Sequence, residues 1–170
     1  EIALIMLPYF LFTAQAGKIA DKYDKAFLFR RIKLFELGLM VVATVAFLTQ
    51  SYVIVLFILF MMGVQSTLFG PVKYSYLPHH LDTSELIAGN VLVGAGTYTA
   101  IILGLLIGGL AVAYAPGDQR VLVLALLSIA LIGYLAARQI PKTPASDPDL
   151  KINFNLWAET RRIVGFARRD

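Results

Sequence analysis

Five long apolar stretches dominate this chain of 170 residues and limit what it can fold into. They are Ile2–Ala16, Ile32–Gln50, Tyr52–Phe69, Leu86–Tyr114 and Val121–Ala137. A helix needs about 20 apolar residues to cross the hydrocarbon core of a bilayer, with a range of roughly 17–25. Four stretches reach that range, whereas the first has only 15 residues. Because a soluble domain of this size has too little interior to hide them, the sequence predicts an all-α membrane protein.

The composition supports this prediction and excludes several kinds of site. Hydrophobic residues make up 58% of the chain and charged residues 15%, against roughly 45–50% and 25% in soluble domains. Cysteine is absent, which excludes disulfides and thiolate ligands. His79 and His80 are adjacent and would diverge on a helix, and Ala95 stands where a P-loop beginning at Gly89 needs lysine. We therefore expect no catalytic residue, no metal and no cofactor.

The basic residues predict the orientation of the stretches in the membrane. When the loops are taken alternately, 14 of the 15 Lys and Arg residues fall on one side and 1 on the other. By the positive-inside rule, the side with 14 faces the cytoplasm. The net charge of +4 therefore reflects topology, and the sequence indicates no nucleic-acid surface.

The two ends of the chain predict a division into two parts. The first stretch is short, begins directly after Glu1 and lacks the features of a signal peptide, so we expect the chain to start inside a transmembrane helix. Residues 1–140 would then be transmembrane helices, and residues 141–170, which contain three prolines, a cytoplasmic linker. Asn155 could cap an amphipathic helix in this linker, lying in the membrane interface or packing on the bundle.

The segment Gly17–Lys25 joins the first two stretches through a short, highly charged cytoplasmic turn. Gly17 permits close helix contact, and Asp21 lies among Lys18, Lys22 and Lys25 as a salt-bridge partner. The segment resembles the signature loop of the major facilitator superfamily, G-x-L-a-D-r-x-G-r, which joins that superfamily's second and third helices. Asp24 replaces the second glycine, which predicts a looser or differently capped turn.

This resemblance implies a fold and a place within it. The five stretches would be about helices two to six of a major facilitator N-terminal helical bundle. The first helix and the second half of the transporter would lie outside this chain. The signature loop would act as a cytoplasmic gate loop, with Gly17, Asp21, Lys22 and Lys25 as the residues that match in type.

Two further segments narrow the resemblance. Gly70–Tyr74, followed by Leu77–Leu81, and the start of the fourth stretch at Glu85–Asn90 are similar to the lysophospholipid transporter family. They are also similar to the transporter domain fused, in some bacteria, to an acyltransferase and an acyl-carrier-protein synthetase. The similarity covers most of Pro8–Gly109. One departure is Gly94, where the family often has glutamate.

The family resemblance implies a secondary transporter and not an enzyme. It would move lysophospholipids across the bacterial inner membrane towards the cytoplasmic leaflet, where they are reacylated. Its partners would be the lipid substrate, membrane lipids, the C-terminal transporter half and, in the fused type, an acyltransferase. Two alternatives stay open: a facilitator for a drug or another small molecule, and a membrane anchor that docks an acyltransferase.

The fourth stretch carries one face of small and polar residues. Their spacing of three and four places them along a single helix side: Asn90, Gly94, Thr97, Ile101, Gly104 and Gly108. Gly104 and Gly108 form a GxxxG pair, for which we expect close helix packing. Asn90 and Thr97 are costly against lipid, so we expect them to face protein or a substrate cavity.

Three further residues are candidates for the cavity or its gate. Glu36 follows Lys33 by three residues, which fits either a local ion pair or a contact with a gate or a substrate amine. Lys73 and Tyr74 lie where the third stretch meets the cytoplasm. There Lys73 either extends towards the membrane surface or binds a phosphate as a point charge.

Overall fold

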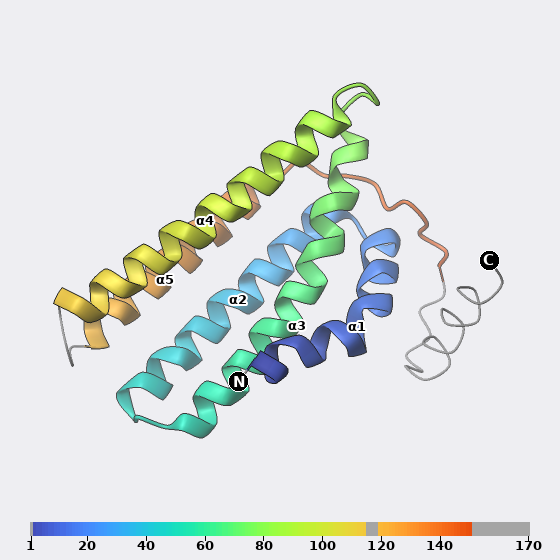
Figure 1. Ribbon diagram of the computed structural model, residues 1–170. Coiled ribbons are helices and arrows are strands. Elements are labelled where there is room, and N and C mark those ends of the chain that lie inside the picture. The colour runs from blue at the N-terminus through green and yellow to red at the C-terminus, as the bar shows by residue number, and fades with distance from the viewer. Residues whose placement is uncertain (1, 115–118, 151–170) are drawn as a thin grey trace.

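The structure is a computed structural model, and it describes residues 2–114 and 119–150 (Figure 1). Its helices, in chain order, are α1 (Ile2–Lys22), α2 (Lys25–Leu48), α3 (Tyr52–Tyr76), the short 3-10 helix η1 (Leu77–His79), α4 (Leu86–Tyr114) and α5 (Gln119–Arg138). No strand occurs among the described residues, in agreement with the predicted all-α fold. The amphipathic helix predicted after Asn155 lies outside them.

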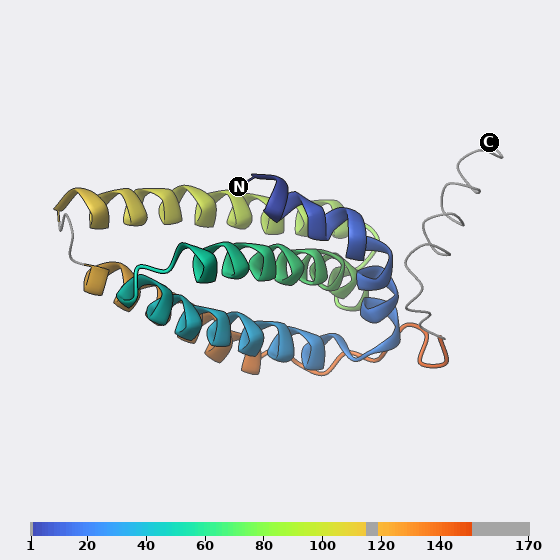
Figure 2. The ribbon, with the colours of Figure 1, turned by 90° about the horizontal axis from the view of Figure 1, so that it is seen from below.

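The helices form a bundle from which α4 stands apart. α3 packs against both α1 and α2, and α5 packs against the other side of α2. Figure 2 shows α5 lying along α2, with α4 set apart from both. α4 has few contacts with α5 and η1, and it has no buried residue. Its small and polar face is therefore left uncovered by the described part of the chain.

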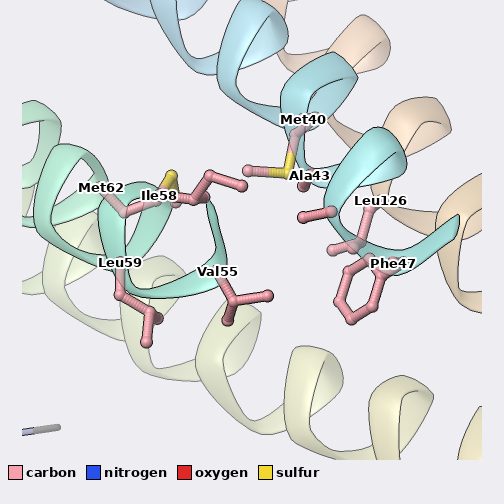
Figure 3. A pocket seen from close by; sticks show the side chains of 9 residues that line it. Met40, Ala43, Phe47, Val55, Ile58, Leu59, Met62 and Leu126 are labelled. Carbon is pink, nitrogen blue, oxygen red and sulfur yellow. The ribbon is translucent and has the colours of Figure 1, made fainter. Parts of the chain in front are cut away.

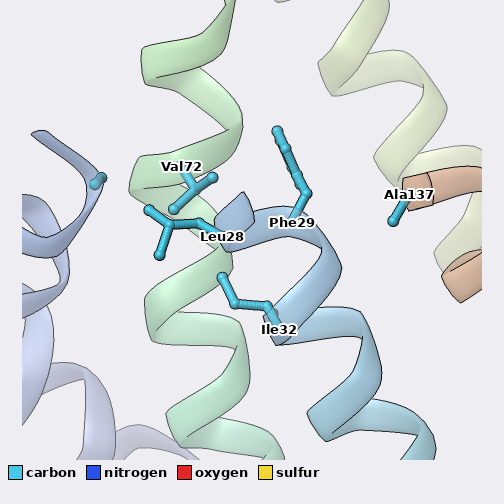
Figure 4. Close-up of a cluster of buried hydrophobic side chains, with 6 residues drawn as sticks. Leu28, Phe29, Ile32, Val72 and Ala137 are labelled. Carbon is cyan, nitrogen blue, oxygen red and sulfur yellow. The ribbon is translucent and has the colours of Figure 1, made fainter. Parts of the chain in front are cut away.

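The ends of the packed helices next to the predicted gate loop enclose a cluster of buried apolar side chains. Leu28, Phe29 and Ile32 of α2 meet Val72 of α3, and small residues at both sides complete the cluster (Figure 4). The Phe29 ring packs edge-on against Phe69 at 5.6 Å between centroids. Aromatic pairs of this geometry stabilise beyond their buried area. This cluster fixes the end of the bundle from which the predicted gate loop emerges.

Three helices are long and apolar enough to cross a membrane, judged by length and composition of the described residues. They are Tyr52–His79, which joins α3 to η1, then Leu86–Tyr114 and Gln119–Arg138. α2, the helix of the second apolar stretch, is not among them, although that stretch was predicted to be long enough to span. It begins at Lys25 and not at Ile32, so it includes a charged end. These helices and the low charge content support the prediction of a membrane protein.

The turn between α2 and α3 contains a residue with an unusual backbone. Gln50 has φ 51°, the left-handed region in which glycine is the usual residue. Its N–H donates to the Phe47 carbonyl at 3.3 Å, and the Ser51 N–H donates to the Ala46 carbonyl at 3.1 Å. This is the Schellman pattern of a helix end. A glutamine here carries a backbone cost that glycine would avoid.

The orientation can be tested with single cysteines in the full-length protein. We expect Ser51→Cys, at the α2–α3 turn, to react with an impermeant thiol reagent added to intact cells, because the basic residues place this end outside. The exposed Thr83→Cys, between η1 and α4, should react only after the membrane is opened. Labelling of Thr83→Cys in intact cells would reverse the orientation. Lys25 is fully buried, so a cysteine there would report on neither side.

Candidate functional site

Asp24 organises the predicted gate loop at the start of α2. Its Oδ1 accepts a hydrogen bond from the Phe27 N–H at 2.7 Å, so the side chain caps the helix. An N-terminal cap of this kind satisfies a backbone donor that the helix itself cannot pair. The structure therefore contains the different cap expected where Asp24 replaces glycine. A Cβ at Gly17 would meet no atom within 4 Å, so the predicted close contact at this glycine is not made in the described residues.

The linker after α5 folds back onto this loop. The Thr143 N–H donates to the second carboxylate oxygen of Asp24 at 2.9 Å, and the Lys25 N–H donates to the Thr143 carbonyl at 3.3 Å. Further along, the Asp147 N–H donates to the Asp21 carbonyl at 3.0 Å. Arg30 reaches the carbonyl of Ile140 with Nη2 at 3.2 Å. We call residues 140–147 the docked linker.

Lys25 lies buried beneath the docked linker. The side chain is fully buried, and its Nζ donates to the Ser146 hydroxyl at 2.8 Å. Burial lowers the pKa of this amine, while the nearby carboxylates of Asp21 and Asp24 act in the opposite direction. In the sequence, Lys25 is one of the three lysines predicted around Asp21. The structure shows its amine bound to the linker, and a salt bridge of Asp21 with these lysines stays a prediction.

The segment after α3 also holds the docked linker. His80 Nε2 lies 2.8 Å from the Thr143 hydroxyl, and His79 Nε2 lies 3.3 Å from the Ser146 hydroxyl. The His80 ring stacks on Tyr76 with 4.3 Å between centroids. No partner for these histidines was predicted from the sequence. Its only signal was the proline-interrupted linker itself, an extended backbone whose polar groups need partners from elsewhere.

Glu36 joins two helices within the bundle. Lys33 Nζ lies 2.8 Å from Glu36 Oε2, which confirms the predicted local ion pair on α2. Gln65 of α3 also donates from Nε2 to the same oxygen at 2.7 Å. Lys33 Nζ also lies 5.2 Å from the centroid of the Phe69 ring. It passes close to α5, because a Cβ added to Gly133 would lie 3.5 Å from this nitrogen. A role for Glu36 in a gate or a substrate contact stays a prediction.

Lys73 and Thr97 come together between α3 and α4. Lys73 Nζ donates to the Thr97 hydroxyl at 3.1 Å, and that hydroxyl donates to the Val93 carbonyl at 2.7 Å. The amine also lies 4.8 Å from the centroid of the Tyr74 ring. Three of the predicted cavity residues are thus neighbours. The one proton of the Thr97 hydroxyl is engaged by Val93, so in this arrangement Lys73 is the group with donors left to bind a phosphate oxygen.

The other predicted residues on α4 are not part of this group. Asn90 and Gly104 are exposed. A Cβ at either Gly104 or Gly108 would meet no atom within 4 Å, so neither glycine packs against another helix of the described chain. Their packing role stays a prediction.

Lys22, in the gate loop, has its Nζ 5.9 Å from the centroid of the Tyr23 ring.

Curated relatives are similar to most of this chain. The Lysophospholipid transporter LplT of Escherichia coli O7:K1 (strain IAI39 / ExPEC) is 31% identical over 160 residues, covering 92% of this chain and 36% of the relative. The protein of the same name from Escherichia fergusonii is 31% identical over 144 residues, covering 82% and 33%. The chain is homologous to the lysophospholipid transporters. This confirms the predicted family.

The matched region is only part of each relative. The chain spans about a third of the length of these curated relatives. No protein-family model and no solved structure matches it. The homology and the apolar helices together agree with part of a transporter bundle of the major facilitator type.

Two substitutions at Asp24 separate its two contacts. Asn keeps one oxygen for the cap of α2 but replaces the acceptor of the Thr143 N–H, whereas Ala removes both. We expect Asp24→Asn to speed hydrogen exchange about tenfold in peptides covering 141–147, or ~1.4 kcal/mol, with exchange at 25–31 unchanged. Asp24→Ala should speed exchange in both segments. Unaltered exchange in the linker of both variants would contradict its docking on Asp24.

The Glu36 contacts predict an effect on stability. Glu36→Gln should destabilise the full-length protein by about 1–3 kcal/mol, because it leaves the Lys33 ammonium without its anion inside the bundle. The measurement is thermal unfolding in detergent. Glu85→Gln, an exposed acid outside the bundle, is the matched control and should have little effect. Equal changes in the thermal unfolding midpoint of the two variants would show that the contacts of Glu36 do not stabilise the bundle.

Proposed function

We propose that this chain is part of a secondary transporter that moves lysophospholipids across the bacterial inner membrane to the cytoplasmic leaflet, where they are reacylated. The observation that carries the proposal is 31% identity, over 92% of the chain, to a protein named as a lysophospholipid transporter. The three long apolar helices support a location in a membrane. The proposed substrate has one acyl chain, a phosphate and often a head-group amine.

The contact between Lys73 and Thr97 supplies the polar part of the proposed site. A lysophospholipid site needs an apolar space beside a small number of polar groups. Lys73 provides the cation and Thr97 holds it at 3.1 Å, on the edge of the uncovered face of α4. That face also carries Asn90 and Gly104, both exposed. A face of small residues would let a lipid chain and a moving helix pass closely.

The docked linker supports a mechanism of alternating access. In the proposed mechanism, two helical halves rock around a central cavity. The linker would lead towards the second half, and it binds Asp21, Asp24 and Lys25 of the gate loop. A shift of the second half would then act directly on this loop. Interactions worth even about 1 kcal/mol bias such a two-state equilibrium several-fold.

Uptake of labelled lysophosphatidylethanolamine into spheroplasts that express the whole gene tests the site. Lys73→Ala should lower uptake about tenfold because a charge-assisted contact with phosphate is lost. Thr97→Val should have a smaller effect, limited to head-group choice, and Gly104→Leu should block uptake by filling the face of α4. Arg138→Ala is the control, an exposed cation at the end of α5 that should leave uptake unchanged.

The outcomes distinguish the proposal from its alternatives. Unchanged uptake in both Lys73→Ala and Gly104→Leu, at matched expression, would contradict the site. No uptake by the wild type, together with normal reacylation in the cell, would favour a membrane anchor for an acyltransferase. If deletion of the gene leaves both lipid uptake and reacylation unchanged, a facilitator for another molecule would be favoured.

A further inference from the structure

An apolar slot lies between α2 and α3 in the halves of these helices that face away from the gate loop (Figure 3). It has a volume of about 220 Å³. Its lining is entirely apolar and consists of Met40, Ala43, Ala46, Phe47, Val55, Ile58, Leu59, Met62 and Leu126. Figure 3 shows the α2 and α3 side chains facing each other across the slot, with Leu126 of α5 near Phe47. Cavities lined in this way stay dry and accept apolar ligands.

The slot adjoins a second cavity that has a polar lining. This cavity, of about 370 Å³, shares Ala46, Phe47 and Val55 with the slot. The rest of its lining carries amides and hydroxyls and consists of Gln50, Ser51, Tyr52 and Gln119. These residues lie at the α2–α3 turn and at the start of α5, the ends that the basic residues place outside. We call this cavity the polar mouth.

Gln50, at the end of α2, lines the polar mouth. This residue is in the left-handed conformation that glycine adopts without strain, with φ 51°. The Schellman hydrogen bonds at the end of α2 hold it in this conformation. Here the strained residue also lines the mouth of an apolar slot. The amide therefore lies where a polar head group would sit when a chain fills the slot.

We propose that the slot and the polar mouth bind a single-chain amphiphile from the outer leaflet. Its acyl chain would enter the slot, and its glycerol and phosphate oxygens would accept hydrogen bonds from the amides and hydroxyls of the mouth. The slot volume equals about seven water molecules, which suits part of one chain and not two. This site is separate from Lys73 and Thr97, which lie towards the cytoplasmic ends.

The inference rests on the proposed function in naming the amphiphile as a lysophospholipid on its way to transport. A diacyl lipid of the bilayer presents the same chemistry with one of its two chains. The probes are therefore lysophosphatidylethanolamine and diacyl phosphatidylethanolamine, each with a photoreactive diazirine at the end of one acyl chain. The full-length protein in nanodiscs is illuminated with each probe, and labelled residues are located by mass spectrometry.

Val55 and Val53 provide a matched pair of variants. Val55 lines the slot, whereas Val53 is 77% exposed two residues earlier on α3. We expect the lysolipid probe to label Met62 or Leu126, and Val55→Phe to reduce that labelling at least tenfold by filling the slot. Val53→Phe should leave it unchanged. The diacyl probe should label these residues at least fivefold less than the lysolipid.

Substitutions of Gln50 separate binding from folding. Gln50→Gly should raise the thermal midpoint because it relieves the left-handed backbone, and yet it should lower lysolipid labelling several-fold because the amide is lost. Gln50→Asn tolerates the same backbone and keeps an amide, so it should retain most of the labelling. If Gln50 has no role in binding, Gln50→Gly will raise the thermal midpoint and leave lysolipid labelling unchanged.

The following results would overturn the inference. They are no labelling in the slot, labelling that Val55→Phe does not reduce, or equal labelling by the diacyl probe, which would indicate an ordinary cleft for bilayer lipid. Uptake of lysophosphatidylethanolamine by the wild type is measured in parallel. Uptake without slot labelling would leave the proposed function standing and reject only the slot, whereas absence of both would reject the proposed function as well.

Discussion

The carboxylate of Asp24 is the group on which the structure around the gate loop depends. One oxygen caps α2 and the other accepts the Thr143 N–H, so a single side chain joins the gate loop to a segment 119 residues away. Both bonds are to a charged acceptor and are therefore stronger than those between neutral groups. The burial of Lys25 follows from this arrangement, since the docked linker covers it, and Thr143 of the linker is itself buried in the contact.

The membrane part combines tight and loose packing. α1, α2, α3 and α5 bury small residues against one another, and the Glu36–Gln65 hydrogen bond ties α2 to α3. α4 has no buried residue, and between it and α3 the structure places the Lys73–Thr97 hydrogen bond. Apolar side chains gain little from one another in lipid, so polar contacts and close packing determine which helices associate. The contrast singles out α4 as the helix whose partners are least defined by this region.

The sequence predicted what depends on local pattern. The lengths of the apolar stretches predicted the helices. The spacing of Lys33 and Glu36 predicted their ion pair, and the replacement of glycine by Asp24 predicted a different cap. It could not give pairings between distant segments, because these leave no period along the chain. The burial of Lys25 is an example: its partner Ser146 lies 121 residues away. The contact of Lys73 with Thr97 depends on how α3 meets α4, which residue types alone do not determine.

The docked linker also shortens a tether. From Ile140 to Asp147 the backbone is fastened to the gate loop and to Arg30. An extended chain reaches about 3.3–3.6 Å per residue, so docking these residues withdraws roughly 26–29 Å of reach. Any segment that follows starts from a point fixed beside Asp21. The effective concentration of that segment near the gate loop is therefore raised, and the distance it can reach from α5 is reduced by the length of the docked residues.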